Sequence, residues 1–233
     1  MAAGNIAISP PETPSATSPH RRDLAELSIG YALILIVIWT PRPWQRLLYC
    51  AAAAYLVAIL WISFPGWHAM GLRTANRARS LWIVGAALLA AAIAMLVAAR
   101  MHTLLWPGGL LPFLHRYLGY ALWALFQQVL LQDFFLQRLL RLTRSPGSAA
   151  LAAAIIFSLA HLPNPILTVV TFVWGLAACK LFLHYRNLYP LALAHAILGI
   201  ALAMTIPGPV TRNMRVGLGY LTYASHHIGQ RRH

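Results

Sequence analysis

The stretch FQQVLLQDFFLQRLLRLT, residues 126–143, carries five polar side chains in an apolar background. An unpaired amide or carboxyl in an apolar solvent costs roughly a few kcal/mol, so such groups need partners. Other runs of comparable hydrophobicity in this chain are nearly free of such residues. The stretch therefore predicts a central helix whose polar side chains meet partners on other helices. These side chains are Gln127, Gln128, Gln132, Asp133 and Gln137.

The composition indicates a membrane protein. The 233 residues are 60% hydrophobic and only 9% charged, whereas a soluble domain carries about 25% charged residues. We expect an all-α fold, a polytopic transmembrane helical bundle of about seven helices that forms one domain. A multi-pass bundle of this kind has the lipid bilayer as its surroundings.

Seven apolar runs separated by turn signals define the expected helices. Within the domain plan, residues 1–24 form a disordered N-terminal tail, 25–208 the transmembrane bundle and 209–233 a basic C-terminal tail. Residues 102–116, with their Pro-Gly-Gly sequence, are expected to form a loop. The runs are Leu27–Trp39, Trp44–Trp67, Leu81–Met101, Tyr117–Leu142, Ala149–His161, Ile166–Tyr185 and Leu188–Ile206.

The charge is strongly unbalanced, with 18 Lys and Arg against 4 Asp and Glu. The arginines are scattered between apolar runs, which is typical of loops that flank membrane helices and not of a nucleic-acid-binding stripe. We therefore expect no nucleic acid partner, and a cytoplasmic N-terminus. Glu12, Asp23 and Glu26 precede the first apolar run, so Asp133 is the only carboxylate expected within the membrane. A mechanism that needs two buried carboxylates is excluded.

Two further polar positions lie at membrane depth, His161 and His195. Helical spacing puts Gln128 and Gln132 on one face, and Phe157 beside His161. Gly199 follows His195 by one turn and leaves room there. Cys50 and Cys179 lack the spacing of a disulfide framework or a metal site and are expected to be core residues.

The order of these residues resembles the CPBP intramembrane proteases, which include the CAAX-type prenyl endopeptidases. The family's first motif, Glu-Glu-x-x-Phe-Arg-Gly, aligns without a gap with Gln127–Asp133. Its second motif, Phe-x-x-x-His, is met by Phe157–His161. Its third combines a Gly-bearing helix, Leu-x-Pro and His-x-x-x-Asn, and is matched by Trp174-Gly175, residues 186–190 and His195. The resemblance covers residues 117–206, a protease-like core.

The sequence departs from the family at chemically important positions. Gln127 and Gln128 replace the two glutamates, and Gly199 replaces the final asparagine. Leu131, Gln132 and Asp133 replace the Phe, Arg and Gly of the first motif. In the family the first glutamate is thought to activate a water, while the histidines orient it or stabilise the oxyanion. A glutamine cannot act as a general base, although it can position a water.

The resemblance implies an intramembrane endopeptidase that processes the C-terminal or membrane-proximal part of a membrane-anchored protein or peptide substrate. His161 or His195 is then the base, and Gln127 and Gln128 hold the water or the substrate carbonyl. Gln132, Phe157 and Gly199 are the expected substrate-binding residues. Some bacterial members of the family are dedicated to C-terminal sorting tails, which implies a bacterial inner or plasma membrane. No cofactor is expected.

Three alternatives remain open at this point. In a pseudoprotease, the glutamines are interhelical hydrogen-bonding groups, and the protein binds or chaperones a membrane partner. A metal site on His161 and His195 falls short of the three protein ligands of catalytic zinc. A transporter is disfavoured because the chain has no inverted repeat. Asp133, about 140° round an α-helix from Gln128, is expected to face Arg138, Gln137 or another helix.

Overall fold

The computed structural model describes residues 19–72 and 77–223, and within these ranges every regular element is a helix. The predicted all-α fold is confirmed. Each of the seven apolar runs contains a helix, and two short helices follow them. The elements are α1 (Pro19–Trp39), α2 (Arg42–Ile62), α3 (Arg77–Arg100), α4 (Leu110–Val129), η1 (Leu130–Leu136), α5 (Gln137–Leu142), α6 (Pro146–Leu159), α7 (Pro165–Tyr185), α8 (Leu188–Thr205), α9 (Gly208–Thr211) and α10 (Gly217–Leu221).

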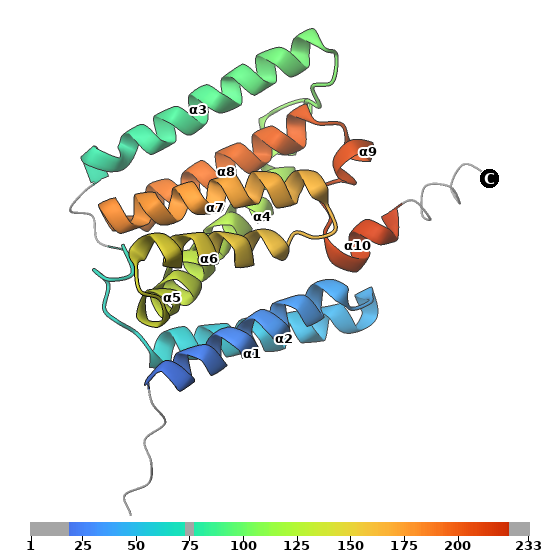
Figure 1. Cartoon of the computed structure of the whole chain (residues 1–233). Coiled ribbons are helices and arrows are strands. Elements are labelled where there is room, and N and C mark those ends of the chain that lie inside the picture. Colours follow the sequence, from blue (N-terminus) through green and yellow to red (C-terminus); the bar gives the residue numbers. More distant parts are fainter. Residues whose placement is uncertain (1–18, 73–76, 224–233) are drawn as a thin grey trace, which may run out of the picture.

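The helices lie side by side as a membrane bundle (Figure 1). In the described residues, α2, α7, α8 and most of α3 are long and apolar enough to cross a membrane. α3 packs on α8, α6 on α7 and α1 on α2, while α4 packs against α8. The chain is therefore a multi-pass membrane protein, with the lipid bilayer as its environment.

The polar stretch lies on one continuous helix made of α4, η1 and α5. The backbone stays right-handed helical through both junctions, but η1 is wound as a π-helix. Its side chains are all buried and include Leu131, Phe134 and Leu136, which are completely enclosed. The predicted loop over residues 102–116 is wrong beyond Gly109, because α4 already begins at Leu110. Its Pro112 lies in the first turn, where no backbone N–H bond is lost.

Helix starts near the site are fixed by local hydrogen bonds. The Ser145 side chain accepts a bond from the Ser148 amide at the start of α6. Asn164 and Asn187 act in the same way at the starts of α7 and α8. Ser, Thr, Asp and Asn at this position satisfy otherwise unpaired N–H groups, worth about 0.5–2 kcal/mol each. The sequence thereby fixes where α6, α7 and α8 begin, and with them His161 in the turn after α6 and His195 on α8.

The segment after α8 folds back onto the bundle as far as the structure describes it. The Asn164 side-chain amide donates to the carbonyls of Thr211 and Arg215, 2.8 and 3.1 Å away. The Gly217 amide donates to the Leu162 carbonyl at 2.8 Å. Residues 209–223, in the predicted basic C-terminal tail, thus pack on the bundle, and 224–233 lie outside the described residues. Of the expected N-terminal tail, 1–18 also lie outside them, whereas 19–24 are helical.

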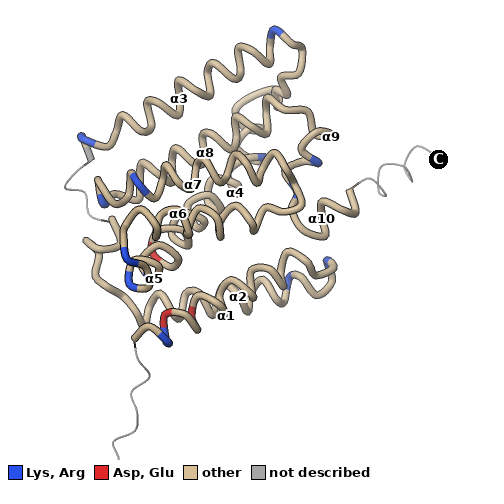
Figure 2. The backbone as a smooth tube through the Cα atoms, in the orientation of Figure 1, with Lys and Arg blue, Asp and Glu red and all other residues tan. Residues whose placement is uncertain are grey.

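Helix α1 is attached to α5 by two ion pairs. Arg141 binds both oxygens of Asp23, at 2.5 and 2.7 Å, and Arg138 lies 2.7 Å from the Glu26 carboxylate. Asp23, Glu26 and Arg138 are buried. Figure 2 shows these acidic residues gathered at the α1–α5 end of the bundle among arginines. The Arg141 guanidinium holds the pKa of the Asp23 carboxyl, in the interfacial turn before the apolar part of α1, below its usual range.

Candidate active site

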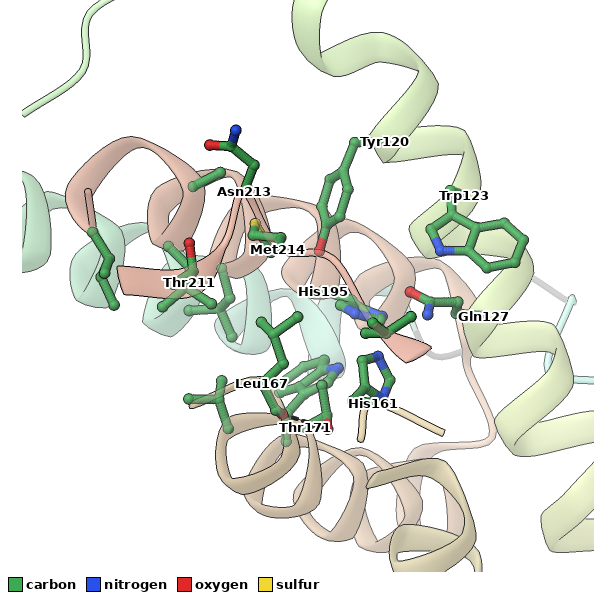
Figure 3. A pocket seen from close by; sticks show the side chains of 18 of the residues that line it. Tyr120, Trp123, Gln127, His161, Leu167, Thr171, His195, Thr211, Asn213 and Met214 are labelled. Carbon is green, nitrogen blue, oxygen red and sulfur yellow. Dashed lines mark hydrogen bonds between the residues drawn. The ribbon is translucent and has the colours of Figure 1, made fainter. Parts of the chain in front are cut away.

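A cavity of about 600 Å³ lies between α4, α8 and the α6–α7 turn, with α9 at its rim. Figure 3 shows the His161 and His195 rings and the Gln127 amide facing the same space. A smaller, nearly apolar cavity of about 120 Å³ adjoins it and shares Trp123, Gln127 and His161. Residues from three distant parts of the sequence therefore converge on one chamber inside the bundle.

A chain of amides holds His195. Gln132 Nε2 donates to Gln128 Oε1 at 3.2 Å, and Gln128 Nε2 lies 3.1 Å from His195 Nδ1. Because the amide nitrogen has only hydrogens to offer, His195 Nδ1 is the acceptor. The proton of the neutral His195 ring is therefore on Nε2, which makes that nitrogen a hydrogen-bond donor. The prediction that Gln128 and Gln132 share a face is confirmed.

His161 has the opposite arrangement of its ring nitrogens. Its Nδ1 lies 2.8 Å from the Phe157 carbonyl oxygen. A carbonyl can only accept, so Nδ1 carries the proton and Nε2 of the neutral ring keeps a free lone pair. The cavity is thus lined by two neutral histidines of opposite character. His161 can accept a proton, and His195 can donate a hydrogen bond.

Aromatic rings fix the positions of both imidazoles. The Phe157 ring contacts His161 and His195 edge to face, with centroids 5.1 and 6.0 Å apart. The Trp174 ring lies 6.0 Å from His195. Gly175 lets α7 approach α6 here, since a Cβ at this position would come within 3.2 Å of Phe157. The expected proximity of Phe157 to His161 is confirmed.

Residues 117–201 match the family model described as Type II CAAX prenyl endopeptidase Rce1-like. The predicted family resemblance is confirmed. The matched segment, called here the endopeptidase-like segment, runs from Tyr117 in α4 to Ala201 in α8 and contains every predicted site residue. A search of curated proteins and a search of solved structures each found no match.

Within the endopeptidase-like segment, the three glutamines of the first motif have different surroundings. Gln127 lines both cavities and is partly exposed. Gln128 is fully buried behind His195, and Gln132 is fully buried behind Gln128. Gln132, which was expected from the sequence to bind substrate, contacts Gln128 and lines neither cavity. Of the three glutamines, Gln127 alone lines the cavities.

Tyr120 is a site residue that the sequence reasoning missed. It lines the cavity, and its hydroxyl lies over Gly199, where an added Cβ would overlap the hydroxyl oxygen. The room predicted beside Gly199 is therefore filled by this phenol. Tyr120, Trp123 and Gln127 follow an i, i+3, i+7 spacing, which places them on one face of α4. This spacing with Gln127 could have indicated from the sequence that Tyr120 lies at the site.

Among the residues that the structure describes, neither carboxylate oxygen of Asp133 has a hydrogen-bond partner, although Asp133 is buried in η1. Of the alternatives expected for Asp133, a pairing with the Arg138 side chain is not found. Arg138 bonds to the backbone carbonyls of Asp133 and Phe134, and its charge is paired with Glu26. Within the described ranges, no three His, Cys, Asp or Glu side chains are grouped closely enough to hold a metal ion.

Proposed function

We propose that this protein is an intramembrane endopeptidase in which His161 is the general base and His195 an oxyanion donor. The observation that carries the proposal is the pair of complementary ring nitrogens in one cavity, within a segment that matches an endopeptidase family. The amide chain behind His195 supports His161 as the base, because it keeps the proton of the neutral His195 ring on Nε2.

The reaction follows from these atoms. His161 Nε2 takes a proton from a water held by the Gln127 amide, and the water oxygen forms a bond to the substrate carbonyl carbon. The carbonyl π pair moves onto its oxygen, which accepts a hydrogen bond from His195 Nε2–H. The oxyanion then collapses, the C–N bond breaks and the His161 proton passes to the leaving amine. Every proton is accounted for without a carboxylate.

The charges around the cavity favour a particular class of substrate. Arg116 lines the cavity, and no Asp or Glu is among the described residues that line it. A guanidinium binds a carboxylate well, often through two parallel bonds. We infer that the substrate is a membrane-anchored protein whose C-terminal segment enters the cavity. We extend the proposal to bacterial inner-membrane proteins with C-terminal sorting tails, as the family resemblance implies.

A binding function without catalysis is the second candidate, and Gln127 favours it. Gln127 occupies the position of the family's first glutamate, and an amide does not titrate near neutral pH. A cavity of this shape can still hold a peptide segment of a membrane partner. The two candidates differ in one observable, the release of a peptide product.

The test uses the purified full chain in phospholipid vesicles with a set of membrane-anchored reporter peptides. Each peptide is made with a free and with an amidated C-terminus, and products are identified by mass spectrometry. We expect the wild type to release C-terminal fragments, and to prefer the free carboxylate. We expect none from His161→Ala or His195→Ala. His184→Ala, which changes a histidine at the far end of α7, is the matched control and retains activity.

Cleavage by His161→Ala at the wild-type rate contradicts the assignment of the base. Retained binding of the peptides by the wild type, with no product from any of them, favours the binding function. Equal cleavage of free and amidated peptides contradicts the proposed role of Arg116.

A further inference from the structure

We propose that the Tyr120 hydroxyl is a second oxyanion donor, acting beside His195 Nε2–H. This inference rests on the proposed function, because it assigns a further residue to the same reaction. It begins with the cavity wall formed by α4 and α8, where the two helices pack together. Figure 3 shows the Tyr120 side chain extending from α4 with its hydroxyl directed toward His195.

The position of the hydroxyl is fixed by Gly199. This glycine lies one helical turn after His195 on the same face of α8. A Cβ added to Gly199 would overlap the Tyr120 hydroxyl and come within 2.5 Å of the ring carbon that bears it. Only glycine therefore admits the phenol at this place. The phenol can occupy this place because residue 199 has no side chain.

The hydroxyl is free to bond to something in the cavity. Within the described part of the chain, no residue accepts from or donates to it, and the Tyr120 side chain is partly exposed. The neighbouring donors differ from it. The Thr171 hydroxyl already donates to the Leu167 carbonyl at 2.6 Å. Trp174 also lines the cavity, and its indole N–H has no partner among the described residues, but that nitrogen is buried. Tyr120 is thus a further neutral donor that a ligand in this space can reach, beside Gln127 and His195.

The chemistry requires such a donor. When water adds to the substrate carbonyl, a full negative charge develops on an oxygen in a region of low polarity. One neutral N–H from His195 offsets that charge only in part, and oxyanion sites generally use more than one donor. A phenol O–H supplies a second donor without introducing a charge. It also supplies a hydrogen-bond donor at a point where Gly199 has no side chain that could supply one.

The test compares two ligands in the detergent-solubilised full chain. One is a peptidyl phosphinate with aliphatic residues on both sides, whose anionic tetrahedral group resembles the oxyanion. The other is the same peptide with a reduced, uncharged methylene link. We expect Tyr120→Phe to weaken phosphinate binding about 10- to 100-fold and to leave binding of the methylene peptide unchanged. Tyr55→Phe, at a tyrosine that lines neither cavity, is the matched control and changes neither affinity.

A second variant distinguishes loss of the hydrogen-bond donor from a disturbance of packing. In the double variant Tyr120→Ala with Gly199→Asn, the phenol is removed and an amide N–H is placed at the same point. We expect it to regain at least a tenfold preference for the phosphinate over Tyr120→Ala alone. Equal loss of both ligands in Tyr120→Phe, or an unchanged preference, overturns the proposal. So does a wild type that does not distinguish the two ligands.

The two proposals fail separately. If the wild type distinguishes the ligands through Tyr120 but releases no product in vesicles, the endopeptidase proposal falls and the oxyanion site stands. If the wild type cleaves peptides and Tyr120→Phe has no effect on kcat or on phosphinate binding, the endopeptidase proposal stands and the Tyr120 proposal falls.

Discussion

The central helix contacts its neighbours through two chemically different clusters. At the junction of α4 and η1, the neutral amides of Gln128 and Gln132 lead to a neutral histidine. Along α5, Arg138 and Arg141 pair with Glu26 and Asp23 of α1. The first cluster lies against the cavity, and the second closes one end of the bundle. Within the described residues, every paired carboxylate belongs to the second.

The difference shows how the chain divides its polar groups. A buried charge is stable only when its partner is in place, so the ion pairs bind α1 firmly to α5. A carboxylate at the position of Gln128 would instead accept a hydrogen bond from His195 Nδ1–H. The Nε2 atom of the neutral His195 ring would then carry no hydrogen. The amides hold the ring and keep the donor on the cavity side. Charge is used for attachment, and neutral amides are used for orientation.

The largest effect is expected from breaking the ion-pair cluster. Arg138→Met leaves the buried Glu26 carboxylate with only the exposed Arg22 as a partner. We expect the free energy of unfolding to fall by about 3–5 kcal/mol, as measured by denaturant titration of the detergent-solubilised protein. The double variant with Glu26→Gln removes the stranded charge and recovers part of the loss. An unchanged unfolding midpoint in Arg138→Met contradicts the role assigned to the pair.

The amide cluster is tested through turnover. Gln128→Leu removes the donor that fixes the His195 tautomer, so we expect kcat for a cleaved peptide to fall about 100-fold with little change in KM. Gln137→Leu, on the same helix but away from the cavity, is the matched control. Gln128→Glu is expected to lose activity as well, because the carboxylate selects the other tautomer. Full activity in Gln128→Glu contradicts the assignment of His195 as a donor.

Asp133 belongs to neither cluster. Its substitution is expected to change the free energy of unfolding by less than Arg138→Met does, and to raise it instead of lowering it. Its carboxylate is buried and has no hydrogen-bond partner in the described part of the chain, so the neutral variant Asp133→Asn avoids the cost of an unpaired buried acid. We expect the free energy of unfolding to rise by about 1–2 kcal/mol and turnover to stay at the wild-type level. A stable but inactive Asp133→Asn protein assigns this residue to the reaction instead.

The smallest effect is the pH dependence of the Asp23–Arg141 pair. The lowered pKa of Asp23 means that the folded protein releases its proton more readily than the unfolded chain. The pair therefore stabilises the fold above the ordinary carboxyl pKa, and this contribution is lost as the pH falls below about 4. Arg141 is half exposed, so we expect about 0.5–1 kcal/mol. Unfolding curves for Asp23→Asn that still lose this amount over the same pH range contradict the attribution.

Much of the fold could be predicted from the sequence because apolar runs and prolines determine where membrane helices form. The same holds for the predicted site residues that line the cavity, Gln127, His161, His195 and Gly199, which lie together as their spacing in three motifs indicated. The π-wound η1 was not predictable, because a rule of about 100° per residue assumes an α-helix throughout.

Other features depended on contacts that a linear pattern does not encode. The pairing of Arg138 with Glu26 joins residues 112 positions apart, so its proximity to Asp133 in the sequence was misleading. Tyr120 reaches the site only because α4 crosses α8 at a glycine. The tautomers of the two histidines required the hydrogen bonds themselves, and therefore the structure.

The central claim is that His161 acts as the base of an intramembrane endopeptidase. Its most direct test compares protein C-termini in the native host, wild type against His161→Ala, by terminal-peptide mass spectrometry. Abundance of the variant is checked by immunoblot, with His184→Ala as control. We predict that a set of membrane-anchored proteins keeps its C-terminal segments only in His161→Ala. Identical C-termini in all three strains, with the variant folded and abundant, would contradict the claim.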